Sequence, residues 1–215
     1  MKRTVLVCLI ALGATATTAA SAAELVIRDV GAGLELPPGG FRFTRHDDAG
    51  STTGSDSFSS GLGLEIHGRW SFARIGDSQG AVTGLALAAD RASYSSGGTW
   101  STSEVRGMLG WGWAMNDRLT LLAEGMVGLG VGRLSIDGNG SFDGYSATGG
   151  VISTGLEAVA LWSVTDRVIL SGVLGYRVSK AKPTGDGVDL DLTLSGFSVA
   201  LGAEWRITDR PFLLE

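Results

Sequence analysis

The chain has 215 residues, of which 34 are glycine and only 4 proline, a composition that disfavours helices and suits curved β-sheets. Its formal net charge of −5 argues against nucleic acid as a partner. Mean hydropathy is positive, at +0.21, yet beyond the N-terminal segment the longest charge-free run is residues 144–156, too short for a membrane-spanning helix. The composition leaves two classes, a soluble β-protein and a membrane β-barrel.

The N-terminal segment has the features of a secretory signal. Lys2 and Arg3 precede an apolar run over residues 5–12, and small residues follow up to Ala23. We therefore expect residues 1–23 to be a signal peptide, because the apolar run is too short for an uncleaved anchor. Cleavage would remove Cys8, the single cysteine, and with it any disulfide, thiolate nucleophile or cysteine metal ligand.

Residues 24–39 are weakly patterned, and Pro37 and Pro38 interrupt any strand ladder there. We expect this segment to be a periplasmic lead-in to a barrel domain over residues 40–215. The first strand is predicted at 40–46, with Phe41 and Phe43 on one face, and a polar loop at 47–56.

The next segment, residues 57–72, alternates with a period of two. Its alternate positions carry Phe58, Leu62, Leu64, Ile66, Trp70 and Phe72. The positions between them carry small, polar and charged residues, including Glu65, His67 and Arg69. Successive side chains of a strand point to opposite faces, so this pattern predicts one apolar and one polar face.

The alternation recurs in six further segments, at 82–94, 103–115, 119–136, 148–164, 168–180 and 190–207. Changes of phase are expected near Arg133, as a β-bulge, and near Ser195 and Gly196. Short turns alternate with longer polar loops. The predicted fold is all-β: an eight-stranded antiparallel up-and-down transmembrane barrel.

Tryptophans indicate which face meets lipid. Five of them lie close to a predicted short turn, as an aromatic girdle at one membrane boundary would: Trp70, Trp111, Trp113, Trp162 and Trp205. The apolar face is therefore expected to point outward.

The polar face then lines the lumen, which its small residues would fill. Charged residues on this face are expected to neutralise one another as a lumen network of Arg42, Glu65, Arg69, Glu104, Arg106, Glu124, Glu157, Arg177, Glu204 and Arg206. These five glutamates and five arginines would balance.

The signal, the eight alternating strands and the tryptophan rim together resemble the small outer-membrane β-barrels of the OmpA/OmpX type. The resemblance implies a location in the cell outer membrane of a Gram-negative envelope. It also implies outer-membrane lipid, lipopolysaccharide and the barrel-assembly machinery as partners, and a monomer. Family members typically end on an aromatic residue, whereas this chain continues to Pro211 and Glu215.

His67, between Glu65 and Arg69 on the polar face, is the residue that most suggests catalysis. Some small outer-membrane barrels are lipid A-modifying hydrolases with a His-x-Ser element, but Arg69 occupies the serine position here, and Asp48 follows His46 in the same way. The acidic segment at 186–191 lacks the ligand spacing of a calcium loop. No enzyme activity, metal or cofactor is expected.

Three functions remain open. The leading one is a porin-like barrel with a filled lumen and a structural or surface-interaction role. The alternatives are a small pore for ions or small solutes, which eight strands make narrow, and a lipid A-modifying enzyme.

Overall fold

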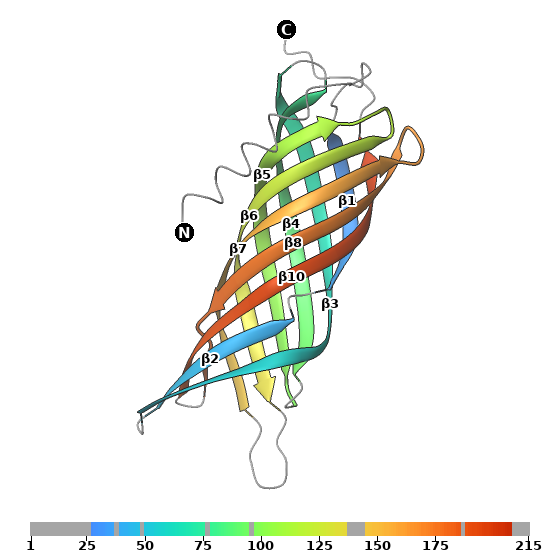
Figure 1. The fold of residues 1–215 in the computed structure, drawn as a ribbon. Helices are drawn as coiled ribbons and strands as arrows, with labels where there is room; N and C mark the ends of the chain where they lie inside the picture. The colour runs from blue at the N-terminus through green and yellow to red at the C-terminus, as the bar shows by residue number, and fades with distance from the viewer. Residues whose placement is uncertain are drawn as a thin grey trace.

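The computed structural model of the chain describes residues 27–36, 39–47, 50–75, 78–94, 97–136, 145–185 and 188–207. These residues form strands and their connections (Figure 1). The strands are β1 (Arg28–Leu36), β2 (Gly40–Asp47), β3 (Gly50–Ile75), β4 (Gln79–Tyr94), β5 (Thr99–Ala114), β6 (Leu119–Ile136), β7 (Tyr145–Ser163), β8 (Val168–Ala181), β9 (Thr184–Gly185) and β10 (Val188–Arg206). Within the described part of the chain, no helix has the length and apolar composition needed to cross a bilayer.

The strands close into one antiparallel barrel with eight wall positions. Strands β3 to β8 follow one another in sequence order, β8 pairs with β10, and β1 and β2 both lie between β10 and β3. The two share one wall position because β1 pairs with residues 199–206 of β10 and β2 with residues 189–195. The predicted fold class, an all-β eight-stranded antiparallel barrel, is confirmed.

The expected boundary of the barrel at residue 40 is wrong. Most of the predicted lead-in forms β1, which pairs with β10 on one side and β3 on the other. The structure does not describe residues 37–38, but the segment before them is paired on both edges, so the prolines do not exclude it from the barrel. The predicted signal peptide and the tail at 208–215 lie outside the described residues.

The first predicted loop, at 47–56, is also mostly strand. Gly40 pairs with Ser57 and Asp47 with Gly50, so β2 and the start of β3 form a hairpin with a short connection. This hairpin extends beyond the neighbouring barrel wall in Figure 1. Serine and threonine are compatible with strands, and the pairing with β10 on the far side of β2 extends the ladder.

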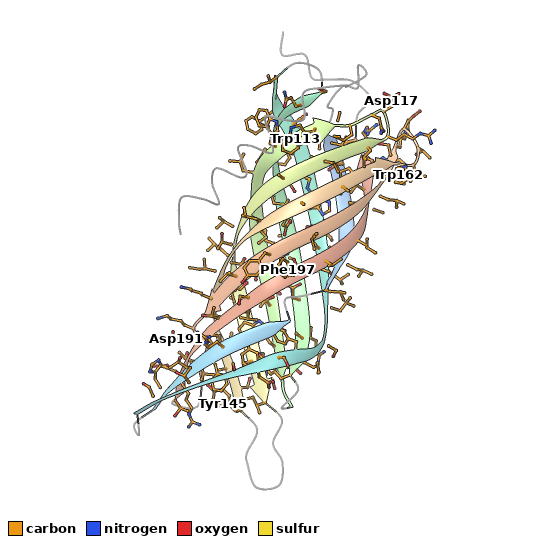
Figure 2. The ribbon with its side chains drawn as sticks, viewed as in Figure 1. Trp113, Asp117, Tyr145, Trp162, Asp191 and Phe197 are labelled. Carbon is orange, nitrogen blue, oxygen red and sulfur yellow. The ribbon has the colours of Figure 1, made fainter. Side chains whose placement is uncertain are left out.

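The barrel has a turn side and a loop side. Connections β5–β6 and β7–β8 lie on the turn side, where Figure 2 labels Asp117 and Trp162. Strand β6 ends and β7 begins on the loop side, where Figure 2 labels Tyr145 and Asp191. The expected asymmetry of short turns and longer loops is confirmed only in part, because β2 and β3 on the loop side are separated by residues 48–49 alone, fewer than separate β5 from β6 or β7 from β8.

Apolar side chains face outward around the whole wall, as predicted. Every wall position contributes an exposed leucine: Leu34, Leu64, Leu85, Leu109, Leu129, Leu156, Leu174 and Leu201. Their exposed fractions range from 53% at Leu34 to 70% at Leu201. We refer to these leucines and the exposed apolar residues beside them as the apolar belt.

The interior is layered along the barrel axis. A turn-side cluster contains Ile27, Val82, Ala114, Leu122, Val159, Leu161 and Ile169. Charged residues occupy the middle, with Ala86, Met108 and Met126 packed among them. A loop-side cluster contains Tyr94, Trp100, Leu134, Val151, Ala181, Leu190, Leu192 and Leu194, with Phe41, Phe43 and Phe58 packed against it.

The phase changes expected near Arg133 and near Ser195 and Gly196 are wrong, because apolar residues of the loop-side cluster occupy inward positions there. Leu134 points inward in step with Glu124, and Leu194 in step with Glu204, so neither β6 nor β10 changes phase. Their ladders run without a register shift at Arg133 or Gly196. The observed shifts lie in β3, between Phe58 and Ser60 and between Ser71 and Ala73.

The first of these shifts corrects the alternation predicted for residues 57–72. Phe58 packs inward against the ring of Tyr94, with a centroid distance of 5.2 Å, whereas Leu62 and Leu64 point outward. Phe41 and Phe43 likewise point inward. At this level apolar side chains fill the barrel.

Candidate functional site

The charged middle layer of the interior is organised around three arginines. Arg69 extends from β3, Arg106 from β5 and Arg177 from β8. At most 3% of each residue's surface is exposed. The inward positions around them are often glycine, alanine or serine, which leaves room for long side chains to cross the bore.

Arg106 binds four carboxylates. Its Nη1 lies 3.0 Å from Glu35 Oε2 and 2.9 Å from Glu65 Oε2. Its Nη2 lies 2.9 Å from Asp90 Oδ2, and its Nε 3.3 Å from Glu104 Oε2. These partners come from β1, β3, β4 and β5, so one guanidinium group ties half of the wall together.

Arg177 completes this network from the opposite wall. Its Nη2 lies 2.7 Å from Glu35 Oε1 and 3.5 Å from Asp90 Oδ2. Strands β8 and β4 are four positions apart in a ring of eight, so the Arg177–Asp90 contact crosses the full bore. Charge-assisted bonds of this kind hold the interior side chains in fixed positions.

Arg69 forms a second network nearer the turn side. Its Nε lies 3.1 Å from Glu124 Oε2 on β6, and its Nη1 3.1 Å from Glu204 Oε1 on β10. His67 adjoins this network: its Nε2 lies 3.2 Å from Glu204 Oε1 and its Nδ1 3.2 Å from Glu65 Oε1. The imidazole is therefore enclosed between two carboxylates and links the two arginine networks.

Seven of the ten predicted network residues meet in these contacts: Glu65, Arg69, Glu104, Arg106, Glu124, Arg177 and Glu204. Glu157 also faces the interior, opposite Glu124 on β6, but forms no ion pair with a described residue. It borders a cavity of about 20 Å³, a volume that accommodates about one water molecule.

Two predicted members lie elsewhere. Arg42 is exposed on the outer surface, because the inward positions of β2 are taken by Phe41 and Phe43. Arg206 lies at the turn-side rim, where its guanidinium donates to Ser163 Oγ at 3.2 Å and to the Asp166 carbonyl at 3.4 Å. The prediction that Arg42 belongs to the lumen network is therefore wrong.

Three acids of the charged middle layer were missed. Asp29 and Glu35 lie on β1, which was expected to precede the barrel, and Asp90 lies at an inward position of β4. Asp90 could have been found from the sequence, because it is the next alternate position after Ala86 and Ala88 on the inward face of β4.

These additions overturn the expected charge balance. The inward-facing carboxylates of the charged middle layer are Asp29, Glu35, Glu65, Asp90, Glu104, Glu124, Glu157 and Glu204. They face Arg69, Arg106, Arg177 and His67. The interior is acid-rich. Within the described residues, no group of three or more His, Cys, Asp or Glu side chains is arranged to hold a metal ion.

The five tryptophans of the predicted girdle lie on the outer face toward the turn side, where Figure 2 labels Trp113 and Trp162. Trp70, Trp162 and Trp205 are 41%, 59% and 52% exposed. Trp111 and Trp113 are partly covered, and Trp111 Nε1 donates to Gln79 Oε1 at 3.4 Å. The sixth tryptophan, Trp100, is buried in the loop-side cluster.

Comparison of the sequence with known protein families finds no match, and comparison with curated proteins finds none either. Among solved structures, the chain is similar to Ail, the attachment invasion locus protein of Yersinia pestis, at 15% identity and a TM-score of 0.43 over 83% of this chain and 98% of that one. It is similar to Neisserial surface protein A at 15% identity and a TM-score of 0.44, over 84% and 97% of the two chains.

A third similar structure is the outer membrane protein OprG from Pseudomonas aeruginosa, at 11% identity and a TM-score of 0.40, over 86% of this chain and 98% of that one. At such identities and TM-scores these similarities say nothing about function. Closure of the wall rests on the strand register, which gives the eight-stranded antiparallel barrel that the resemblance to the OmpA/OmpX type implied.

Proposed function

We propose that this protein is an outer-membrane barrel with a closed interior and a structural or surface-interaction role. The observation that carries the proposal is the apolar belt, which surrounds a charged interior on all eight wall positions. A soluble barrel buries its apolar face, and an exposed apolar surface of this extent is typical of a lipid-facing wall. Strands β3 to β8 and β10 exceed the roughly 9–11 residues that cross a bilayer, and β1 and β2 divide the eighth wall position between them.

The interior argues for a barrier rather than a channel. Arg106 and Arg177 carry ion pairs across the bore, and apolar clusters fill both ends of the described interior. Opening a path would require separating these buried charge pairs, and removing one partner of such a pair costs about 3–5 kcal/mol. A structural or surface role therefore fits the interior better than a pore for ions or small solutes.

An enzyme remains the least supported function. His67 is the strongest candidate base, and both of its ring nitrogens face carboxylates. A general base in hydrolysis needs a free nitrogen directed at a hydroxyl or water. We propose a non-enzymatic role, with lipopolysaccharide and the barrel-assembly machinery as the expected partners of a monomer.

Two measurements test the proposal. Heat-modifiable gel mobility of the outer-membrane fraction tests location and closure together, and unchanged migration after boiling would contradict both. Single-channel recording in a planar bilayer then separates barrier from pore. Folded protein is expected to give no discrete conductance steps. Steps that remain after the protein has been purified to homogeneity would support the pore.

A further inference from the structure

The outer surface carries four basic residues at the loop-side edge of the apolar belt. Each lies on a strand that runs from the turn side to the loop side, and each is exposed: Arg42 on β2, Arg91 on β4, Arg133 on β6 and Lys180 on β8. Three of them end outward-facing apolar runs on their own strands, as Arg133 follows Leu129 and Val131, which are 61% and 58% exposed. The fourth, Arg42, shares its wall position with β1, whose outer face carries Leu34 and Leu36. Four wall positions thus pass from an apolar to a cationic outer face at this edge.

The strand register places two of the four in one row across β4, β5 and β6. Arg91 pairs with Ser101, and Ser101 pairs with Arg133, so the three residues lie side by side on the outer face. Neighbouring strands are about 4.8 Å apart, which puts the two arginine Cα atoms about 10 Å apart. Arg133 Nε donates to Ser146 Oγ on β7 at 3.2 Å in this structure, so its side chain must turn toward Ser101 for the two arginines to converge on one anion. Two charged forks and a hydroxyl form a donor set for one oxyanion.

A second row of the same composition crosses β8, β10 and β2. Lys180 pairs with Thr193, and Thr193 pairs with Arg42. As in the first case, the middle residue carries a hydroxyl and lies on a strand that runs from the loop side to the turn side. The two cations beside it lie on strands that run in the opposite direction. We call Arg91, Ser101 and Arg133 the first row, and Lys180, Thr193 and Arg42 the second row.

None of the four cations forms an ion pair with an acid among the described residues. The acid beside the second row is Asp191, two residues from Thr193 on β10. Its Oδ1 lies 3.3 Å from Lys182 Nζ and its Oδ2 3.2 Å from His46 Nε2, so this carboxylate already has two basic partners. The rows keep their positive charge available to an external anion.

We infer that the two rows bind the phosphate groups of lipid headgroups in the loop-side leaflet. The inference rests on the proposed function, because it requires the apolar belt to lie in a membrane. A headgroup phosphate is held at the edge of the hydrocarbon region, at the level where Arg91 pairs with exposed Leu62 and Lys180 pairs with exposed Ile152. A lipid would thus place its acyl chains on the belt and its phosphate on a row. A free phosphate ion would contact the row alone.

The test uses the full barrel folded in a neutral detergent and titrated with bisphosphorylated lipid A, with bound lipid counted by native mass spectrometry. The variant Arg91→Gln/Arg133→Gln removes the charges of the first row, and Lys180→Gln/Arg42→Gln those of the second. Each is expected to weaken binding about thirtyfold, since a basic residue near anionic headgroups contributes about fivefold. Dephosphorylated lipid A should bind wild type and variants alike, and excess inorganic phosphate should compete weakly.

The matched control is Arg118→Gln/Arg167→Gln, which removes two exposed arginines from the turns at the opposite rim. It should bind lipid A as wild type does. Equal binding by the row variants and wild type, or equal binding of the dephosphorylated lipid by wild type, would overturn the inference while leaving the membrane barrel standing. Strong competition by inorganic phosphate would assign the rows to a soluble anion instead. A chain that shows no heat-modifiable fold in detergent would overturn the proposed function, and this inference with it.

Discussion

The middle and the loop side of this barrel are built in opposite ways along the same strands. In the middle, Glu124 on β6 points inward while Leu129 points outward. On the loop side of the same strand, Leu134 points inward while Arg133 points outward. The backbone alternation continues without interruption, and only the chemistry on each face is exchanged.

This difference shows that what surrounds the wall, not the strand, decides which face is apolar. Where the exterior is the apolar belt, charged side chains must go inside and pair with one another. Where the exterior carries Arg42, Arg133 and Lys180, apolar side chains fill the interior as in a soluble protein. On the outer face of β6 the exchange falls between Val131 and Arg133, which marks the loop-side boundary of the belt on that strand.

The largest effect should come from removing the central cation of the middle region. Arg106→Met leaves Glu35, Glu65, Asp90 and Glu104 facing one another without their shared guanidinium. We expect the free energy of unfolding to fall by about 5 kcal/mol, at the upper end for a broken buried ion pair. Guanidinium chloride unfolding in detergent, followed by tryptophan fluorescence, measures the loss.

The control for this substitution is Arg42→Met, since the sequence placed Arg42 in the same network and the structure places it outside. Its effect should stay within about 0.5 kcal/mol. A similar loss in both variants would contradict the separation of interior from exterior at Arg42.

On the loop side, the interior depends on aromatic packing. Trp100 is 3% exposed in the loop-side cluster, and Trp100→Ala should cost about 3 kcal/mol through the cavity it leaves. Trp162→Ala removes a tryptophan that is 59% exposed and should cost less than about 1 kcal/mol in detergent. Comparing the two unfolding midpoints tests whether this level is a true core; equal midpoints would mean that it is not.

A smaller effect is expected from filling the space that glycine leaves beside the middle network. A Cβ at Gly128 would lie 2.8 Å from Glu104 Oε2 and 3.2 Å from Arg106 Cγ. Gly128→Leu should therefore cost about 2 kcal/mol by displacing charged side chains. Gly107 faces outward with open space around it, so Gly107→Leu is the matched substitution and should be close to neutral. The two losses are compared by the same unfolding measurement.

The smallest effect concerns pH on the loop-side exterior. Hydrogen bonds from His46 and then from Lys182 hold the pKa of Asp191 below its ordinary value. A lowered pKa in the folded state means that this carboxylate stabilises the fold above the unfolded-state pKa, and that the contribution disappears as the pH falls through the lowered pKa. His46→Ala should raise the pKa of Asp191 in an NMR titration, and an unchanged pKa would show that His46 makes no such bond in solution.

Much of the wall could be predicted from the sequence because alternation is a local property of each strand. Residues such as Leu64, Leu109 and Leu201 point outward as expected, since lipid-facing and interior positions must alternate along every spanning strand. Seven of the ten expected network members meet for the same reason: inward positions of a narrow barrel cannot avoid one another.

The errors share one cause, the assumption that the apolar face points outward along the entire strand. That assumption assigned Phe41 and Phe58 to the exterior, placed Arg42 inside, and required phase changes near Arg133 and Gly196 that do not occur. It could not locate the level at which the two faces exchange their chemistry. The position of this exchange along the barrel axis depends on the register between neighbouring strands.

By itself the sequence determined that the chain forms strands, that the strands alternate and that their number closes a small barrel. Those properties follow from residues close together in the chain. Only the tertiary structure decided which carboxylates share Arg106, that β1 belongs to the wall, and where the apolar interior begins. Those depend on register between strands far apart in sequence, such as Glu35 on β1 and Arg177 on β8, and register is a property of the closed sheet.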